Sequence, residues 1–289
     1  MTPSAPPPAN SGLSIRTMRP EEIALAVDWA AAEGWNPGLA DAGCFAVPDR
    51  QGFLLGEVDG VPAATVSCVN YSADFAFLGF YIVRPDLRGR GLGLQIWNAA
   101  IAHAGSRVIG LDGVVAQQAN YRKSGFSFAY PNVRYGGTVM SMNAPRADVV
   151  ALTEVPFAAV EADNAMVFPA PRSAFLRAWI SAPGHVGCAL MRDGRLVGWG
   201  VIRPCRKGRK IGPLVAEDRA AAETVLSGLV AKAGGGEIFL DVPAVNREAT
   251  ALAQSLGLSP VFETARMYTG AIPRLRLERV FGVTTFELG

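Results

Sequence analysis

The two halves of this 289-residue chain repeat one order of strand and helix signals, and this repeat is the strongest constraint on the fold. Four landmarks of the first half recur in the second at a nearly constant distance. The offsets are 134 residues from Asp59 to Asp193, 133 from Gly79 to Gly212, 129 from Asp112 to Asp241 and 132 from Gly125 to Gly257. The spacing predicts a tandem duplication with a boundary near residues 143–150, and the length suits two domains of ordinary size.

Turn and apolar patterns give each half the same elements. In the first half, residues 13–18 alternate like a strand, two strands meet at Asp59-Gly60, and FAFLGFYIV (75–83) is apolar on both faces, as in a central strand. We expect a helix to about residue 104, a strand at 107–112, a short helix around 117–124 and two closing strands. The second half repeats the hairpin at Asp193-Gly194 and a helix from about 217 to 233.

This order predicts an α/β (α+β) protein in which each domain has a mixed, mostly antiparallel sheet flanked by helices. We expect a disordered tail over residues 1–12, a first domain over 13–145 and a second over 146–289.

Composition excludes several classes of protein. Half of the residues are apolar, 18% are charged and the net charge is +2, which argues against disorder and gives no drive toward nucleic acid or membranes. The chain starts without the apolar segment of a signal peptide, and no uncharged apolar run reaches the roughly 18 residues that span a bilayer. The four cysteines lie far apart, without a CxxC pair. We expect a cytoplasmic protein with no metal, no nucleic-acid partner and no membrane partner.

The segment RPDLRGRGLGLQIW (84–97) places arginines and glycines where a helix begins. Free N–H groups at a helix start, glycine flexibility and positive charge together suit a phosphate, although such a loop alone is more often an exposed turn. A P-loop is excluded because GxxxxGK[ST] is absent, and Leu94 stands where a Rossmann fingerprint needs its third glycine.

The segment IVRPDLRGRGLG resembles the acyl-CoA-binding motif of the GNAT N-acetyltransferase superfamily, [RQ]xxGx[GA] after a strand ending in V-x-P. NYRKSGF (120–126) is similar to the second signature of that superfamily, a tyrosine four residues before a Gly-Phe pair. The resemblance covers residues 13–142 and matches the order of elements around both motifs.

The resemblance implies acetyl transfer from acetyl-CoA to a primary amine, which the covering second domain suggests belongs to a small molecule. The implied cofactor residues are Ile82, Val83, Arg88, Gly89, Arg90, Gly91, Leu92, Gly93 and Asn120. Tyr121 would donate a hydrogen bond or proton to the leaving sulfur, although it also fits a packing role on its helix. Trp35 and Asn36, in a loop that borders the acceptor side of this fold, would contact substrate, and a packed tryptophan in a stiff turn is an equal alternative.

The general base is left open. Many relatives use a glutamate on the central strand, but FAFLGFYIV carries no carboxylate. Asp74, Glu33 or a water chain remain as alternatives, and an acceptor that arrives neutral is another. A non-catalytic acyl-CoA-binding or sensor protein is the competing function, since the base is missing.

The second half lacks the cofactor motif. Its matching segment, IGPLVAEDRAAAETVL (211–226), has acidic residues in place of the Arg-Gly run, and Ala253 falls where Tyr121 would. We therefore expect a degenerate second domain and one active site per chain. The basic run RPCRKGRK (203–210) is expected to be a solvated turn. Both a monomer and a homodimer are compatible with the sequence.

Overall fold

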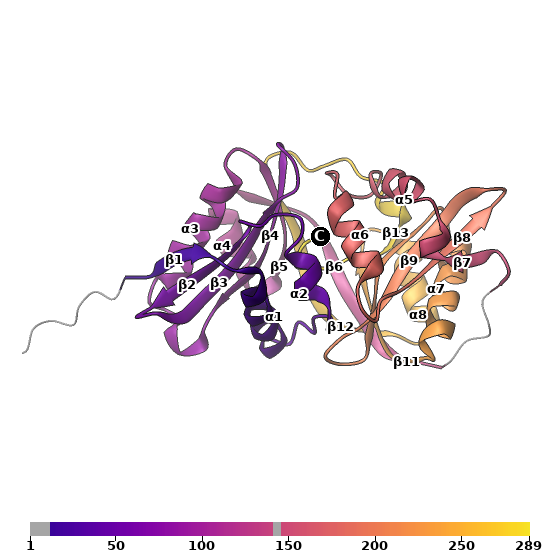
Figure 1. The fold of residues 1–289 in the computed structure, drawn as a ribbon, viewed down its shortest axis with the longest axis horizontal. Coiled ribbons are helices and arrows are strands. Elements are labelled where there is room, and N and C mark those ends of the chain that lie inside the picture. The colour runs from indigo at the N-terminus through magenta and orange to yellow at the C-terminus, as the bar shows by residue number, and fades with distance from the viewer. Residues whose placement is uncertain (1–11, 141–145) are drawn as a thin grey trace, which may run out of the picture.

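A computed structural model describes residues 12–140 and 146–289. The expected tail therefore lies outside the described residues except for Gly12, and so does part of the expected boundary near 143–150. Figure 1 shows two lobes, one from each half of the chain, joined by long strands at the middle.

The first half forms the elements that its turn signals predict. The strands are β1 (Ser14–Thr17), β2 (Phe53–Val58), β3 (Val61–Asn70), β4 (Phe75–Val83), β5 (Val108–Val114) and β6 (Phe126–Val139), and the helices are α1 (Ile23–Ala32), α2 (Asp41–Phe45), α3 (Leu92–Ala104) and α4 (Gln118–Lys123). Asp59 and Gly60 both have positive φ, at 52° and 75°, as the tight hairpin between β2 and β3 requires. Helix α3 buries Ile96, Trp97 and Ala100, which the helical period places on one face.

The second half repeats this order. Its strands are β7 (Val149–Ala151), β8 (Val186–Arg192), β9 (Arg195–Pro204), β10 (Arg209–Ala216), β11 (Gly236–Pro243), β12 (Ser259–Thr269) and β13 (Val280–Gly282), and its helices are α5 (Phe157–Asn164), α6 (Ser173–Ser181), α7 (Arg219–Ala233) and α8 (Arg247–Ser255). Asp218 and Asn246 cap α7 and α8 through their side-chain oxygens. The repeat in the sequence is thus a repeat of structure.

The closing strands of the two halves are exchanged. The sheet runs β1-β2-β3-β4-β5-β12-β6-β11-β10-β9-β8-β7, with β13 paired to β10. Strand β12 therefore lies beside β5 of the first half, and β6 lies beside β11 of the second. The two closing strands expected after residue 124 are one 14-residue strand, because β12 and β11 pair with opposite edges of β6 along its length.

Equivalent ion pairs join each exchanged strand to its new neighbour. Arg134 of β6 faces Asp241 of β11, and Arg266 of β12 faces Asp112 of β5. Each guanidinium donates two hydrogen bonds to its carboxylate, at 2.6 and 2.8 Å in the first pair and 2.8 and 2.7 Å in the second. The exchange is therefore reciprocal, and each half depends on the other for its last strand.

The central strand of each half separates from its parallel neighbour at the same place. Strands β4 and β5 pair as far as Leu78 and Leu111, and β10 and β11 pair as far as Ile211 and Leu240. In the second half the gap is filled by β13, which pairs with β10, while the Val283 N–H donates to the Asp241 carbonyl at 2.8 Å. In the first half the gap is open and forms the pocket described below.

The segment 283–289 runs between the two halves. It is buried throughout, and the C label of Figure 1 lies between the lobes. A Cβ added to Gly212 would lie 2.4 Å from the Val283 carbonyl oxygen, and one added to Gly79 would lie 2.1 Å from the Glu287 carbonyl oxygen. The two glycines that the sequence comparison matched are therefore the places where this segment packs against the central strands.

We expect Gly79→Ala to lower the free energy of unfolding by about 1–3 kcal/mol, because the added methyl group overlaps the main chain of Glu287. Gly212→Ala should have a similar effect for the same reason. Urea unfolding measures both, with Gly43→Ala as the control, since nothing lies within 4 Å of a Cβ at that helical position. An unchanged stability of Gly79→Ala would show that segment 283–289 moves aside without cost.

An apolar cluster also joins the halves. Phe45 of α2 lies 5.6 Å from Phe80 of β4 and stacks on Trp179 of α6 at 6.2 Å between ring centroids. Leu288 belongs to the same cluster and is fully buried. This packing and the shared sheet fix the relative positions of the residues that surround the pocket.

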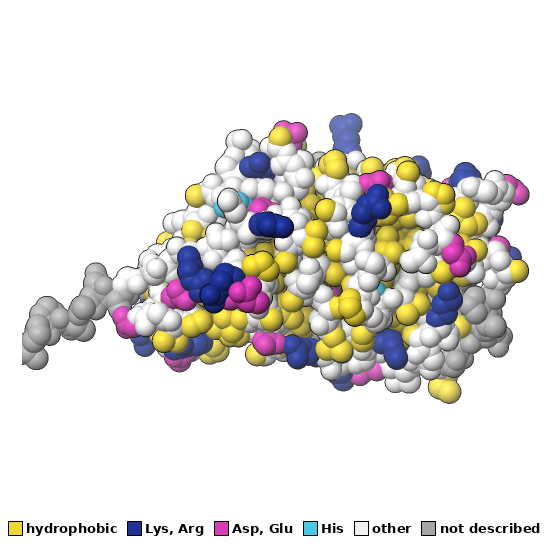
Figure 2. Space-filling view, in the orientation of Figure 1, with side chains coloured by type: hydrophobic (Ala, Val, Ile, Leu, Met, Phe, Trp, Pro, Cys, Tyr) yellow, Lys and Arg dark blue, Asp and Glu magenta, His cyan; other side chains and the backbone are white. Residues whose placement is uncertain are grey.

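On the face of the molecule that Figure 2 shows, Lys and Arg side chains are scattered. Charges of both signs lie together over β1 and the start of α1. There Arg16 pairs with both Glu22 and Glu57. Among the residues described, no helix is long and apolar enough to cross a membrane.

Candidate active site

A pocket of about 480 Å³ opens where β4 and β5 separate. Its lining runs from the loop before α3, along residues 78–83 of β4 and 111–114 of β5, to aromatic residues of the second half. Seven of the nine implied cofactor positions line it: Ile82, Val83, Arg88, Gly89, Gly91, Leu92 and Gly93. Tyr121 and Trp35 line it as well.

The Arg-Gly loop brings free main-chain groups to one end of this pocket. Gly89 and Gly91 have φ values of 79° and 77°, which L residues rarely adopt, and α3 begins immediately after Gly91. The first N–H groups of α3 have no partner within the helix and, with the helix dipole, favour an anion. Arg88 reaches back to the Val83 carbonyl and to Glu33, so its guanidinium is held at the pocket rim.

A bulge in β4 shapes the middle of the pocket. Thr65 pairs with Ile82 and Ser67 with Gly79, so two residues of β4 oppose one residue of β3. Phe80, in the bulge, has a φ of 49°, and its carbonyl accepts a 2.9 Å hydrogen bond from the Thr65 hydroxyl. From Gly79 onward the edge of β4 that faces the pocket has no strand partner in residues 12–140 or 146–289. This edge is the place for an extended ligand arm.

Tyr121 projects from α4 toward this edge. Its ring stacks on Trp97 at 5.5 Å between centroids, and it packs so closely on Gly113 that a Cβ there would lie 2.3 Å from the ring. Burial, with a smaller effect of Tyr81, raises the pKa of Tyr121 to about 12. The phenol is therefore a hydrogen-bond donor throughout the physiological pH range.

Three predicted site residues lie outside the pocket lining. Arg90 is exposed on the loop, and Asn120 donates a 2.8 Å hydrogen bond to the side chain of Gln117 on the surface. Asn36 exchanges two 2.9 Å hydrogen bonds with the main chain of Lys207, so it joins the first half to the second. Its left-handed conformation, with a φ of 52°, suits an asparagine in a turn.

Among the described residues, three acidic residues belong to the pocket lining: Glu33, Asp112 and Glu287. Glu33 pairs with Arg88, and Asp112 accepts from Arg266 and from Asn132. Asp74, the alternative considered just before the central strand, is exposed at the other end of β4 and outside the lining. Glu287 was not found from the sequence, because nothing in TTFELG (284–289) indicates where that segment lies in the fold.

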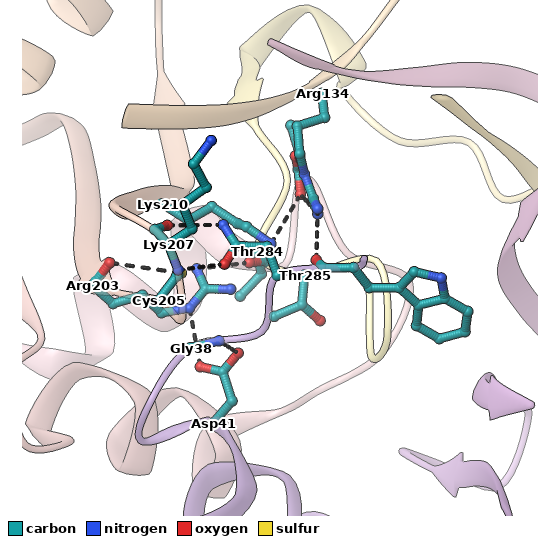
Figure 3. A network of polar contacts seen from close by, with 12 residues as sticks. Gly38, Asp41, Arg134, Arg203, Cys205, Lys207, Lys210, Thr284 and Thr285 are labelled. Carbon is teal, nitrogen blue, oxygen red and sulfur yellow. Dashed lines mark hydrogen bonds and ion pairs between the residues drawn. The ribbon is translucent and has the colours of Figure 1, made fainter. Parts of the chain in front are cut away.

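A network of buried charges lies next to the pocket, between the halves (Figure 3). Arg134, besides its pair with Asp241, donates a 2.6 Å hydrogen bond to the Trp35 carbonyl. Arg203 donates to Asp41 at 3.0 Å, and Asp41 also accepts from the Gly38 N–H at 2.7 Å. Burial raises the pKa of Asp241, but Arg134 and then Lys210 lower it below the usual value.

This network corrects the expectation of a solvated basic turn at 203–210. Arg203 and Lys210, at the two ends of the run, are 0% and 1% exposed because they lie within β9 and β10. The middle of the run does form an exposed turn, where Arg206 pairs with Asp28 and Lys207 with Glu237.

Comparisons with known proteins identify the family of both halves. The acetyltransferase (GNAT) family matches residues 20–126, and an acetyltransferase (GNAT) domain matches residues 160–282. The holothin acyltransferase of Pseudoalteromonas sp. (strain SANK 73390) is 32% identical over 271 residues, which are 93% of this chain and 92% of that protein. The chain belongs to the GNAT acetyltransferase family. It is an acyltransferase built from two tandem GNAT domains.

Solved structures show the same fold for the whole GNAT tandem. A putative acetyltransferase from Pyrococcus horikoshii superposes with a TM-score of 0.82, 22% identity and full coverage of both chains. A tandem GNAT protein from the clavulanic acid biosynthesis pathway superposes with a TM-score of 0.61 and 15% identity, over 91% of this chain and 100% of that one.

Proposed function

We propose that this GNAT protein transfers an acetyl group from acetyl-CoA to the primary amine of a small molecule, at one site in its first half. The observation that supports this most is that one pocket contains the Arg-Gly loop, the free edge of β4 and Tyr121. The N–H groups of residues 88–93 would hold the CoA pyrophosphate, and Ile82 and Val83 would pair with the pantetheine arm as an added strand.

The chemistry is attack of the neutral amine on the thioester carbonyl carbon. A C–N bond forms, the C–S bond breaks, the sulfur leaves with the electron pair, and the amine loses a proton. With its pKa near 12, Tyr121 is a much weaker acid than a thiol of pKa about 8.5, so it stabilises the departing thiolate by a hydrogen bond and keeps its own proton.

The second half supports the transfer without a second cofactor site. β13 occupies the gap between β10 and β11, and Phe281 of β13 is 1% exposed in the core of that half. At the start of α7, Asp218 accepts from the Ala221 N–H at 2.8 Å, so a carboxylate takes the place that a phosphate would need. We therefore assign one acetyl-CoA to each chain.

The acceptor would lie at the end of the pocket where the two halves meet. Trp35, Phe262 and Phe286 line this end, and the Arg134 guanidinium lies 5.6 and 5.0 Å from the two phenylalanine ring centroids. An aromatic surface at one end of a pocket suits a flat, small molecule. The relative that is 32% identical is named a holothin acyltransferase, which supports acyl transfer by this chain.

The test is acetyl-CoA-dependent thiol release with a panel of primary amines, with calorimetry of CoA binding in parallel. Turnover on any amine, with formation of the amide, supports the proposal. Tight CoA binding with no turnover on any amine would favour the sensor function instead. A protein with no affinity for CoA would contradict both the transferase and the sensor function.

Gly91→Ala should weaken CoA binding by about tenfold, because the strained alanine reorients the N–H groups that begin α3. Gly60→Ala is the matched control, since Gly60 has a nearly identical φ of 75° and equally open surroundings but lies in the β2–β3 turn. Calorimetry with CoA compares the two variants. Equal binding by both would remove the Arg-Gly loop from the cofactor site.

A further inference from the structure

We propose that Glu287, on the segment 283–289 of the second half, is the general base that accepts the proton of the acceptor amine. This inference rests on the proposed acetyl transfer. It assigns to the second half a direct part in the chemistry of the first.

The main chain places Glu287 against the reactive part of β4. The Glu287 carbonyl oxygen would lie 2.1 Å from a Cβ added to Gly79. Gly79 is one residue before the bulge at Phe80. Glu287 lines the same pocket as Tyr121 and the free edge of β4. FAFLGFYIV therefore needs no carboxylate of its own, because its glycine makes room for a segment that brings one.

Unlike Glu33 and Asp112, the Glu287 side chain forms no ion pair within residues 12–140 and 146–289. Glu33 and Asp112 are held by arginines, as described above. Glu287 is 3% exposed, and its Oε1 is buried without a hydrogen-bond partner in the part of the chain that the structure describes. A buried acceptor without a partner is costly, and a substrate N–H would satisfy it.

The groups around Glu287 shift its pKa in both directions. Burial raises the pKa of Glu287, Lys210, Arg134 and Arg203 oppose that effect, and Asp41 adds to it. A carboxylate with a raised pKa is a stronger base than an exposed one. Activity should then fall as the pH drops through this raised pKa, where Glu287 becomes protonated.

In the reaction, the lone pair of the amine nitrogen forms the new C–N bond, and the N–H proton moves to the Glu287 carboxylate. The electron pair of the C–S bond leaves with sulfur, which accepts a hydrogen bond from Tyr121. The proton on Glu287 then passes to solvent, and the enzyme returns to its starting state.

The experiment compares wild type, Glu287→Gln and Glu287→Asp in acetyl-CoA turnover from pH 5 to 9, on the fastest of three amines: benzylamine, tryptamine and 2-aminothiazole. Glu278→Gln is the matched control, because Glu278 precedes the same segment but is exposed and pairs with Arg276 on the surface. CoA affinity and thermal melting are measured for each variant.

We expect Glu287→Gln to lower kcat/KM about 100-fold at pH 7 and to lose the acid limb of the pH profile, with CoA affinity and melting temperature kept. Glu287→Asp should recover part of the rate and the acid limb, and it carries the test if the glutamine variant does not fold. Rates of Glu287→Gln within about threefold of wild type, or an unchanged pH profile, would overturn the assignment. Absence of turnover by the wild type would instead overturn the proposed acetyl transfer itself.

Discussion

Replacing Arg134 by methionine is expected to lower the free energy of unfolding by about 3 kcal/mol at pH 7, because it leaves Asp241 charged and buried. Lys210, whose Nζ lies 4.0 Å from Asp241, still compensates part of the Asp241 charge. The expected loss of stability is therefore at the low end of the range for a broken buried ion pair. The same change removes the hydrogen bond to the Trp35 carbonyl. Urea unfolding at pH 7 measures the loss.

The matched control is Arg276→Met, which breaks an exposed pair with Glu278 and should cost less than about 1 kcal/mol. Adding Asp241→Leu to Arg134→Met should restore part of the stability, since the uncompensated charge is gone. Equal losses from Arg134→Met and Arg276→Met would show that the buried pair does not hold the exchanged strands.

Tyr121→Phe is expected to lower kcat for acetyl transfer by about 10²- to 10³-fold while the affinity for CoA stays within about twofold. The phenylalanine ring keeps the stacking on Trp97, so only the hydrogen bond to the departing sulfur is lost. Because the pKa of Tyr121 is about 12, the wild type should show no alkaline loss of rate from this group below pH 10. Steady-state kinetics and calorimetry with CoA measure these effects.

Tyr135→Phe is the control for this prediction, since Tyr135 is also buried but packs in the core of the second half. It should keep the wild-type rate. If Tyr121→Phe turned over as fast as wild type, the phenol would have only a packing role.

The assignments of Tyr121 and Glu287 predict different pH behaviour, which separates them in one data set. Loss of the carboxylate removes the acid limb, whereas loss of the phenol lowers the rate at every pH and leaves that limb in place. The two groups lie on elements of different halves, so a double variant also reports whether the halves act together in one step.

Most residues at the loop end of the pocket could be placed together from the sequence. The residues from Arg88 to Gly93 occupy one loop, and the loop and the strand before it set their positions by local geometry. Asn120, on the short helix α4, and Asn36, in a turn, each neighbour a residue that lines the pocket but lie outside the lining themselves. Asn36 contacts a loop 171 residues away, which no local pattern indicates.

The end of the pocket where the two halves meet was not predictable for a different reason. Arg203 and Lys210 occur in a run that resembles an exposed turn, but their strands extend into the space between the halves and bury them. Phe262 comes to the pocket because β12 crosses to the first half, and Phe286 and Glu287 because the segment 283–289 runs between the halves.

The sequence by itself determined the duplicated order of elements, the Asp-Gly hairpins, the Arg-Gly helix start and the loss of that motif in the second half. These depend on backbone preferences and periodicities that act over about twenty residues or fewer. Only the tertiary structure decided the exchange of β6 and β12, the filling of the second gap by β13 and the contact of Glu287 with Gly79. That contact joins residues 208 positions apart, and it exists because a glycine in a bulged strand leaves room for one passing backbone.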